Sequence, residues 1–161
     1  MVEQIVRQWR EKAPGLDTSP LEVSARILRL ARQFEDRRSD VLREHGLGLA
    51  DFDVLATLRR AAGRSGMTPS QLIRSVMLTS GGITKGLDRL ERAGLLERAP
   101  DARDRRSIRV VLTPEGRRVV DSVLPEILRA ESSLLEGLSE RDRQRFIRLL
   151  GALLATAESE T

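Results

Sequence analysis

The sequence of 161 residues predicts a mainly α-helical fold with one small β-hairpin. Apolar residues recur at helical spacing through most of the chain, and several of these segments begin with a helix-capping pattern. Two short runs, 95–98 and 108–112, are typical of strands and flank a charged turn. The length fits one domain, or one domain that shares its core with a second copy.

The composition excludes several classes of protein before any motif is considered. The chain has no cysteine, which rules out disulfides, cysteine-based zinc sites and thiol redox sensing. Its apolar runs fall short of the roughly 18 residues that a membrane span needs. The N-terminal stretch VEQIVRQWREK is too charged for a signal peptide. We therefore expect a cytoplasmic protein with no membrane partner.

The first part of the chain is expected to form two helices. Ser19-Pro20-Leu21-Glu22 matches a capping box with proline at the first helical position, and apolar residues follow at helical spacing as far as His45-Gly46. A second helix is expected from about Gly48 to the glycine-containing stretch AAGRSG. Whether the extension before Ser19 forms a stable helix is left open.

The central part has the order of a winged helix-turn-helix. Thr68-Pro69-Ser70-Gln71 is a second capping box and opens a short helix. After a tight turn, Ser80 is expected to cap a longer helix, which places Leu87 and Leu90 inward and ends at Gly94. The two strands then form a hairpin, the wing. In this arrangement the longer helix enters the major groove of DNA.

Two further helices are expected after the hairpin. Thr113-Pro114-Glu115 opens the first, in which Pro125 is expected to cause a kink or a break, and Ser139 caps the last. The apolar stripes of the N- and C-terminal helices exceed what a thin lobe could cover. We therefore expect a homodimer, with an intramolecular helical bundle as the alternative. The C-terminal stripe consists of Leu134, Leu135, Leu138, Phe146, Leu149, Leu150, Leu153 and Leu154.

Positive charge gathers in the part that is expected to bind DNA. The net charge is +4, and residues 80–109 alone hold eight cations against five anions, a local excess of +3. A basic patch of this kind indicates a polyanionic partner. The preference for arginine over lysine is also consistent with the codon bias of a GC-rich genome, so the local excess carries more weight than the total.

The longer helix and the tip of the wing supply the candidate DNA contacts. Small and polar residues at the start of the helix allow close approach to base edges. The tip PDARDRRS, residues 100–107, has the size to reach the adjacent minor groove, where Arg106 is expected to enter while Asp104 orients its guanidinium. The alternative is a solvated hairpin with incidental salt bridges. The predicted contacts are Ser80, Gly81, Gly82, Thr84, Lys85, Arg89, Arg103, Asp104, Arg105 and Arg106.

The run LTSGGITKGLDRLERAGLLERAPDARDRRSIRVVLTPEG resembles the DNA-binding core of the MarR family of bacterial transcriptional regulators. It contains, in order, T-x-x-L-D-R-L-E-x-x-G-L-x-x-R, the wing D-x-x-D-R-R-S and the exit L-T-x-x-G. The resemblance extends over about residues 20–157. It implies a winged lobe, residues 48–113, and a homodimer through intertwined N- and C-terminal helices, residues 1–45 and 114–161. It also implies a small anionic or phenolic ligand that binds between these parts and weakens DNA binding.

Three further residues are similar to the urate-responsive branch of that family. Trp9, the only tryptophan, together with Asp53 and Arg98 occupies the places of three pocket residues in that branch. Arginine pairs with an anionic purine, tryptophan stacks or hydrogen-bonds, and a buried aspartate is repelled by the anion. Some members have a basic residue in the recognition helix where this chain has Gly86. The implied ligand is an anion, with urate, citrate, aconitate or a phenolic compound as candidates.

The sequence argues against an enzyme. His45 is the only histidine, cysteine and tyrosine are absent, and Gly81-Gly82 lacks the spacing of a phosphate-binding loop. We expect neither a cofactor nor a metal site. A winged helix that contacts only proteins, or one without a small-molecule ligand, stays as an alternative, although the basic wing favours nucleic acid. The sequence therefore predicts a ligand-responsive transcriptional repressor that binds a pseudo-palindromic operator as a homodimer.

Overall fold

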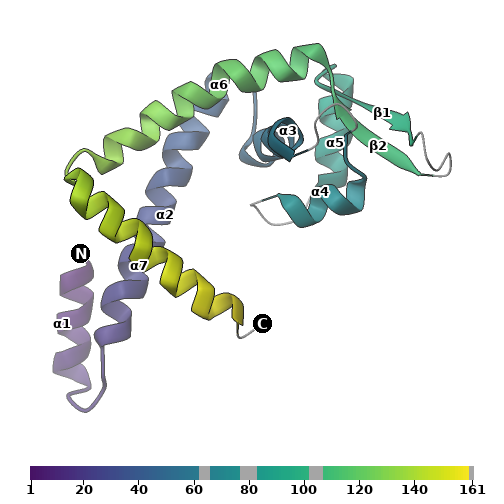
Figure 1. Ribbon diagram of the computed structural model, residues 1–161. Coiled ribbons are helices and arrows are strands. Elements are labelled where there is room, and N and C mark those ends of the chain that lie inside the picture. Colours follow the sequence, from purple (N-terminus) through teal and green to yellow (C-terminus); the bar gives the residue numbers. More distant parts are fainter. Residues whose placement is uncertain (62–65, 77–82, 102–106, 160–161) are drawn as a thin grey trace.

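The structure is a computed structural model, and it describes residues 1–61, 66–76, 83–101 and 107–159. Within these ranges the chain is mainly helical and has one two-stranded antiparallel sheet. A lobe of short helices and the hairpin lies at one end, and longer helices extend from it (Figure 1). The elements are α1 (Val2–Lys12), α2 (Ser19–Glu44), α3 (Leu49–Ala61), α4 (Pro69–Ser75), α5 (Ile83–Arg92), β1 (Leu96–Pro100), β2 (Ile108–Leu112), α6 (Pro114–Ser132), a 3-10 turn (Ser133–Leu135) and α7 (Glu140–Ser159).

The core of the lobe is built from aliphatic side chains that each element turns inward. α3 contributes Val54, Leu55 and Leu58, and Leu72 of α4 and Leu90 of α5 pack in the same cluster. All five are at most 2% exposed. Full burial of side chains of this size contributes about 1.5–3 kcal/mol each. Apolar packing is therefore the main force that holds the helices and the hairpin together.

A third backbone segment fixes the hairpin to the lobe. The register pairs Leu96 with Leu112 at the base of the hairpin. Met67, just before α4, forms an antiparallel bridge with Val110, with N···O distances of 3.0 and 2.8 Å. β2 has the predicted bounds, whereas β1 begins one residue later than predicted and continues to Pro100.

Three helices begin at the caps that the sequence predicts. Thr68 accepts a hydrogen bond from the Gln71 N–H, and the Gln71 side chain accepts one from the Thr68 N–H, which completes the capping box. Thr113 accepts from the Gly116 N–H at 3.0 Å to cap α6. Ser139 accepts from the backbone N–H three residues later at 3.2 Å to cap α7. These bonds satisfy donors that a first helical turn leaves unpaired.

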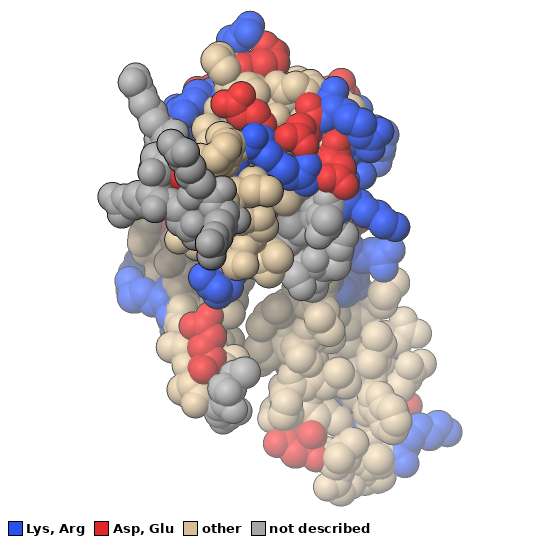
Figure 2. Space-filling view, turned by 90° about the vertical axis from the view of Figure 1, so that its right-hand side faces the viewer, with Lys and Arg blue, Asp and Glu red and all other residues tan. Residues whose placement is uncertain are grey.

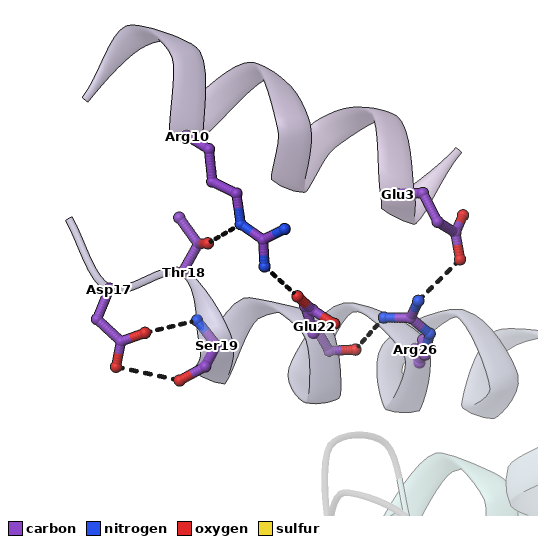
Figure 3. A network of polar contacts seen from close by, with 7 residues as sticks. All are labelled: Glu3, Arg10, Asp17, Thr18, Ser19, Glu22 and Arg26. Carbon is purple, nitrogen blue, oxygen red and sulfur yellow. Dashed lines mark hydrogen bonds and ion pairs between the residues drawn. The ribbon is translucent and has the colours of Figure 1, made fainter. Parts of the chain in front are cut away.

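The predicted capping box at Ser19 is wrong. α2 does begin at Ser19, but the N–H and hydroxyl of this residue donate to the Asp17 carboxylate at 2.9 and 3.0 Å (Figure 3). Glu22 turns toward α1, where Arg10 Nη2 donates to it at 2.5 Å (Figure 3). The local pattern fails because an ion pair with another helix takes the glutamate that the box needs.

The N-terminal extension forms a helix, α1, that packs along α2. Val2 and Val6 are buried, and α1 and α2 are in contact. Arg26 of α2 donates to Glu3 at 2.7 Å, so that ion pairs reinforce the apolar contact (Figure 3). Trp9 lies on the same helix and is 51% exposed. α1 is therefore anchored along one face only.

α6 is continuous through Pro125, where the sequence predicts a kink or a break. The helix spans Pro114–Ser132 and joins the lobe to the outer helices (Figure 1). Val120 and Val123 before the proline and Ile127 after it are all buried. This packing compensates for the backbone hydrogen bond that a proline removes from a helix.

α2 and α7 leave apolar faces uncovered in the single chain. α7 has no buried residue and crosses α2 (Figure 1). The two helices line an open groove of about 690 Å³. Two leucines of this groove, Leu149 and Leu153, are 56% and 50% exposed. Within the described ranges, no helix combines the length and the hydropathy that a bilayer span requires.

Candidate nucleic-acid interface

α4 and α5 form the helix-turn-helix, and α5 is the helix that is expected to enter the major groove. Its inner face buries Leu87 and Leu90 in the core of the lobe. Thr84 and Lys85 lie in its first turn, and the Lys85 side chain is exposed to solvent. Its exposure leaves Lys85 available for the DNA contact that the sequence predicts. The predicted contacts Ser80, Gly81 and Gly82, the first of which is also the predicted cap, lie outside the described residues.

Arg89, a further predicted DNA contact, bonds a buried aspartate of α3. Its Nε and Nη2 donate to Asp51 Oδ2 and Oδ1 at 3.0 and 2.5 Å. These hydrogen bonds raise the pKa of Arg89 above its ordinary value. Sequence reasoning missed Asp51, because no local spacing shows that two charges 38 residues apart face each other.

Arg109 holds the wing near the tip end of its strands, where it pairs with Ala99. Its Nε donates to Asp101 Oδ2 at 2.6 Å, and its Nη1 donates to the Gly66 carbonyl at 2.8 Å. The Asp101 N–H donates to the Ser107 carbonyl at 2.8 Å, across the hairpin. The guanidinium therefore links the wing to the segment before α4. The predicted tip contacts Arg103, Asp104, Arg105 and Arg106 lie outside the described residues.

Arg98, on β1, bonds two carboxylates of α5. Its Nη2 donates to Asp88 at 2.6 Å and its Nη1 to Glu91, which also accepts from the Arg98 backbone N–H at 3.1 Å. The hydrogen bond with Asp88 is the main cause that raises the pKa of Arg98. At the end of the lobe that carries the hairpin, acidic and basic side chains accordingly alternate (Figure 2).

These ion pairs reduce the positive charge that the basic patch offers to a partner. Arg89, Arg98 and Arg109 each share their charge with a carboxylate of the lobe. A paired guanidinium offers less attraction to a phosphate than an unpaired one, because the carboxylate cancels part of its field. Within the described residues, these three arginines fix the positions of the helix and the wing.

The structure does not bring Trp9, Asp53 and Arg98 together within one chain. Trp9 is on α1, which lies at the end of the molecule remote from the hairpin that carries Arg98 (Figure 1). Asp53, on α3, lines a cavity of about 250 Å³ between α2, α3 and α6. Neither Trp9 nor Arg98 is among the described residues that line it.

The cavity beside Asp53 combines buried apolar residues with more exposed arginines. Arg59 donates to Asp121 at 2.9 and 3.2 Å, and Arg38 donates to Glu131. An anion that enters can compete with these carboxylates for the guanidinium groups. Sequence reasoning missed the arginines, because they come from different helices and share no motif. The lining includes Arg38, Arg59, Arg60 and Glu131, with Leu42, Leu49, Phe52, Ala56, Val120, Leu124, Ile127 and Leu128.

Comparisons with known proteins agree with this architecture. A sequence model of the MarR family matches residues 45–107. The chain is similar to the HTH-type transcriptional regulator PecS of Dickeya dadantii, with 36% identity over 150 residues, 93% of this chain and 90% of PecS. BpsR of Bordetella bronchiseptica, whose DNA binding is regulated by 6-hydroxynicotinic acid, has a similar fold. The TM-score is 0.72 at 23% identity, over 88% of this chain and 97% of BpsR. S. aureus MepR in complex with DNA gives a TM-score of 0.71 at 20% identity, over 83% of this chain and 97% of MepR.

Proposed function

The chain belongs to the MarR family of DNA-binding transcriptional regulators, and on this premise we propose that it represses transcription as a homodimer on a pseudo-palindromic operator. A small anionic ligand, with urate as the first candidate, releases the dimer from DNA. Curated relatives are named transcriptional regulators, which is consistent with a role in regulation rather than catalysis.

One observation carries the proposal. The helix-turn-helix and its wing lie at one end of the chain, and the uncovered apolar faces of α2 and α7 lie toward the other (Figure 1). A two-fold dimer formed through these faces presents two α5 helices to the same side of a duplex. Such dimers read half-sites separated by about 10 base pairs, one turn of the double helix.

The exposed apolar surface supports the second copy as the partner of α2 and α7. Val23 and Ile27 of α2 are 49% and 39% exposed and line the same groove as Leu149 and Leu153 of α7. Each 100 Å² of apolar surface that a partner covers contributes about 2.5 kcal/mol. A contiguous apolar face of this kind is a feature of interaction sites rather than of a free surface.

The cavity beside Asp53 supports an aromatic anion as the ligand. Its arginines, Arg38, Arg59 and Arg60, suit a carboxylate or an enolate, and its buried apolar residues suit a flat ring. Urate meets both requirements. The apolar lining also favours a phenolic or aromatic carboxylate over citrate and aconitate, which have no ring to bury.

Trp9 and Arg98 can contact urate in the cavity only if two conditions are met. The second chain has to bring its α1 to the cavity, because α1 of the same chain lies far from β1, the strand that carries Arg98 (Figure 1). Arg98 has to give up Asp88 and Glu91, to which it is bonded without the ligand. Binding of an anion would then release β1 from α5 and disturb the DNA-reading surface.

DNA binding is tested with a fluorescent duplex from the region upstream of the coding sequence and a shuffled duplex of the same composition. Anisotropy titrations at several salt concentrations should show a preference for the first duplex on the order of a thousandfold or more. Equal affinity for both duplexes at every salt concentration would overturn operator binding. Sedimentation velocity on the same samples tests the homodimer, and a stable monomer at micromolar concentration would exclude it.

The ligand is tested by adding urate, citrate or 6-hydroxynicotinic acid to the preformed complex. Urate or the aromatic carboxylate should release the DNA, and Arg59→Gln should weaken that release about tenfold or more, the loss expected for one charge-assisted contact. Arg118→Gln is the matched control, because Arg118 pairs with Glu115 on α6 and does not line the cavity. Release by citrate alone would remove the ring requirement, and equal effects of both variants would remove the site.

A further inference from the structure

Asp51 is a buried carboxylate that belongs neither to the predicted DNA contacts nor to the cavity proposed for the ligand. It lies in the first turn of α3 and is 5% exposed. The Gly48 N–H approaches its Oδ2 at 3.4 Å, a long and weak contact. Burial of an ionised carboxylate is unfavourable unless a partner compensates for the lost water. The strong partner of Asp51 is on the recognition helix.

The bond between Asp51 and Arg89 has the geometry of a fork. Both carboxylate oxygens accept, at 3.0 Å from Nε and at 2.5 Å from Nη2. Two parallel bonds fix the plane of the guanidinium, which one bond from a lysine would not do. The Arg89 side chain is 57% exposed on its other side, whereas that of Asp51 is 7% exposed. The buried aspartate on α3 is therefore the fixed member of the pair, and it holds the arginine of α5.

Gly86 lies beside this fork. A Cβ on Gly86 would lie 3.5 Å from Asp51 Oδ1 and 3.9 Å from Arg89 Nη2. α5 thus turns its glycine face toward the carboxylate, one helical turn before Arg89. An added Cβ at this position would be in ordinary van der Waals contact with both members of the pair.

We infer that Asp51 and Arg89 set the rotation of α5 on the lobe, so that Arg89 is a positioning residue for DNA reading. Leu87 and Leu90 hold α5 on the lobe, but apolar contacts permit small rotations about the helix axis. The fork removes that freedom on the α3 side, and Arg98 holds Asp88 and Glu91 from β1 on the other. Base readout needs side chains placed to within a hydrogen bond, so a free rotation would lower sequence preference. The inference rests on the proposed binding of operator DNA through α5.

Arg89→Ala and Asp51→Ala test the inference in the full-length protein. Affinities for the operator and for a shuffled duplex are measured over a salt series. Each variant should lose about tenfold or more in operator affinity, the double variant should be no worse than the weaker single variant, and affinity for the shuffled duplex should stay unchanged. The slope of log affinity against log salt should also stay unchanged, because no phosphate contact is removed.

A phosphate contact through Arg89 gives the opposite pattern. Arg89→Ala would then weaken both duplexes and reduce the salt slope by about one per subunit, whereas Asp51→Ala would free the guanidinium and tighten binding. Either result overturns the inference. Arg92→Ala is the control on the same helix, because the described bond of Arg92 is to the Asp88 carbonyl of α5 itself. It should leave the preference for the operator over the shuffled duplex unchanged.

A second double variant protects the test against misfolding. Arg89→Ala alone leaves a buried carboxylate without its partner, which destabilises a fold strongly. Asp51→Leu with Arg89→Met replaces the pair by apolar side chains, which is often neutral for stability. This variant should fold, bind the shuffled duplex as the wild type does, and lose operator preference. If the wild type prefers the operator and this double variant keeps the same preference, the inference is wrong and the proposed function stands. If the wild type shows no preference for the operator, the proposed function itself is wrong.

Discussion

Gly116→Ala is expected to destabilise the protein, although alanine is the better helix former. Gly116 lies in the first turn of α6, where a Cβ would stand 2.0 Å from the Leu95 carbonyl oxygen and 2.7 Å from Leu112 Cδ2. Carbon and carbonyl oxygen in contact normally lie about 3.3 Å apart, so the backbone on one side must move by more than about 1 Å. The same Leu95 oxygen accepts from the Thr113 N–H at 3.2 Å, which the movement would break or lengthen.

Two opposing contributions set the magnitude. Helix propensity favours alanine over glycine by about 1 kcal/mol. Overpacking in a closely packed site costs about 1–3 kcal/mol and occasionally more, and the upper part of this range applies here because the obstructing atom belongs to the backbone. The net loss of unfolding free energy should be about 1–2 kcal/mol, which lowers the melting temperature by roughly 2–8 °C for a chain of this size.

Differential scanning calorimetry at equal protein concentrations measures the effect. Gly151→Ala in α7 is the control, because within the single chain no atom beyond its sequence neighbours and the backbone of its own helix lies within 4 Å of the added Cβ. It should raise the melting temperature slightly, as propensity alone predicts. A melting temperature of Gly116→Ala equal to or above that of the wild type would refute the reasoning and show that α6 can move away from the hairpin without cost.

Three further predictions concern other parts of the chain. Thr68→Ala removes the hydroxyl that accepts from the Gln71 N–H at the start of α4, although the backbone N–H of residue 68 still donates to the Gln71 side chain. The unfolding free energy in a urea titration should fall by about 0.5–2 kcal/mol; an unchanged midpoint and slope would contradict this. Glu3 has a pKa below its ordinary value, because of its backbone hydrogen bond and the charge of Arg26. A lowered folded-state pKa stabilises the docked α1 above the unfolded value of 4.5 and loses this effect as the pH falls through the lower, folded value. Trp9 fluorescence should therefore stay constant down to that range, and a change near neutral pH would argue against the ion pair. Leu153→Glu should convert the proposed homodimer to monomers in sedimentation velocity, because it places a charge in the groove between α2 and α7; an unchanged dimer would exclude this face.

A signal within one segment predicted its structure correctly where no other segment competed for its residues, and contacts between segments did not follow from such signals. The capping box at Thr68 formed because both of its partners lie within one helical turn. The box at Ser19 did not form, because Arg10 of another helix bonds Glu22 more strongly than a backbone N–H does. Pro125 illustrates the same limit: its local effect is real, but burial on both sides keeps α6 continuous.

The same distinction between local signals and contacts across segments applies to the candidate site. The order of helix, turn, helix and hairpin follows from local patterns, and it led to α5 and its residues. The pairing of Arg89 with Asp51 depends on how α3 packs against α5, and a basic residue looks the same in a sequence whether or not a carboxylate faces it. Asp53 was found through resemblance, whereas its arginine neighbours Arg38 and Arg59 come from separate helices and gave no signal.

The continuity of α6 makes it a lever. Its 19 residues correspond to a rigid arm of about 28 Å, from the base of the wing to the turn before α7. A pivot of about 5° at one end of such an arm displaces the other end by roughly 2.5 Å, which is enough to break a base contact. Pro125 removes one hydrogen bond near the middle of the arm, where Leu124 and Leu128 line the cavity beside Asp53. The point of α6 with the weakest backbone support thus lies next to the cavity, so a molecule that entered the cavity could bend the helix there instead of turning it as a whole.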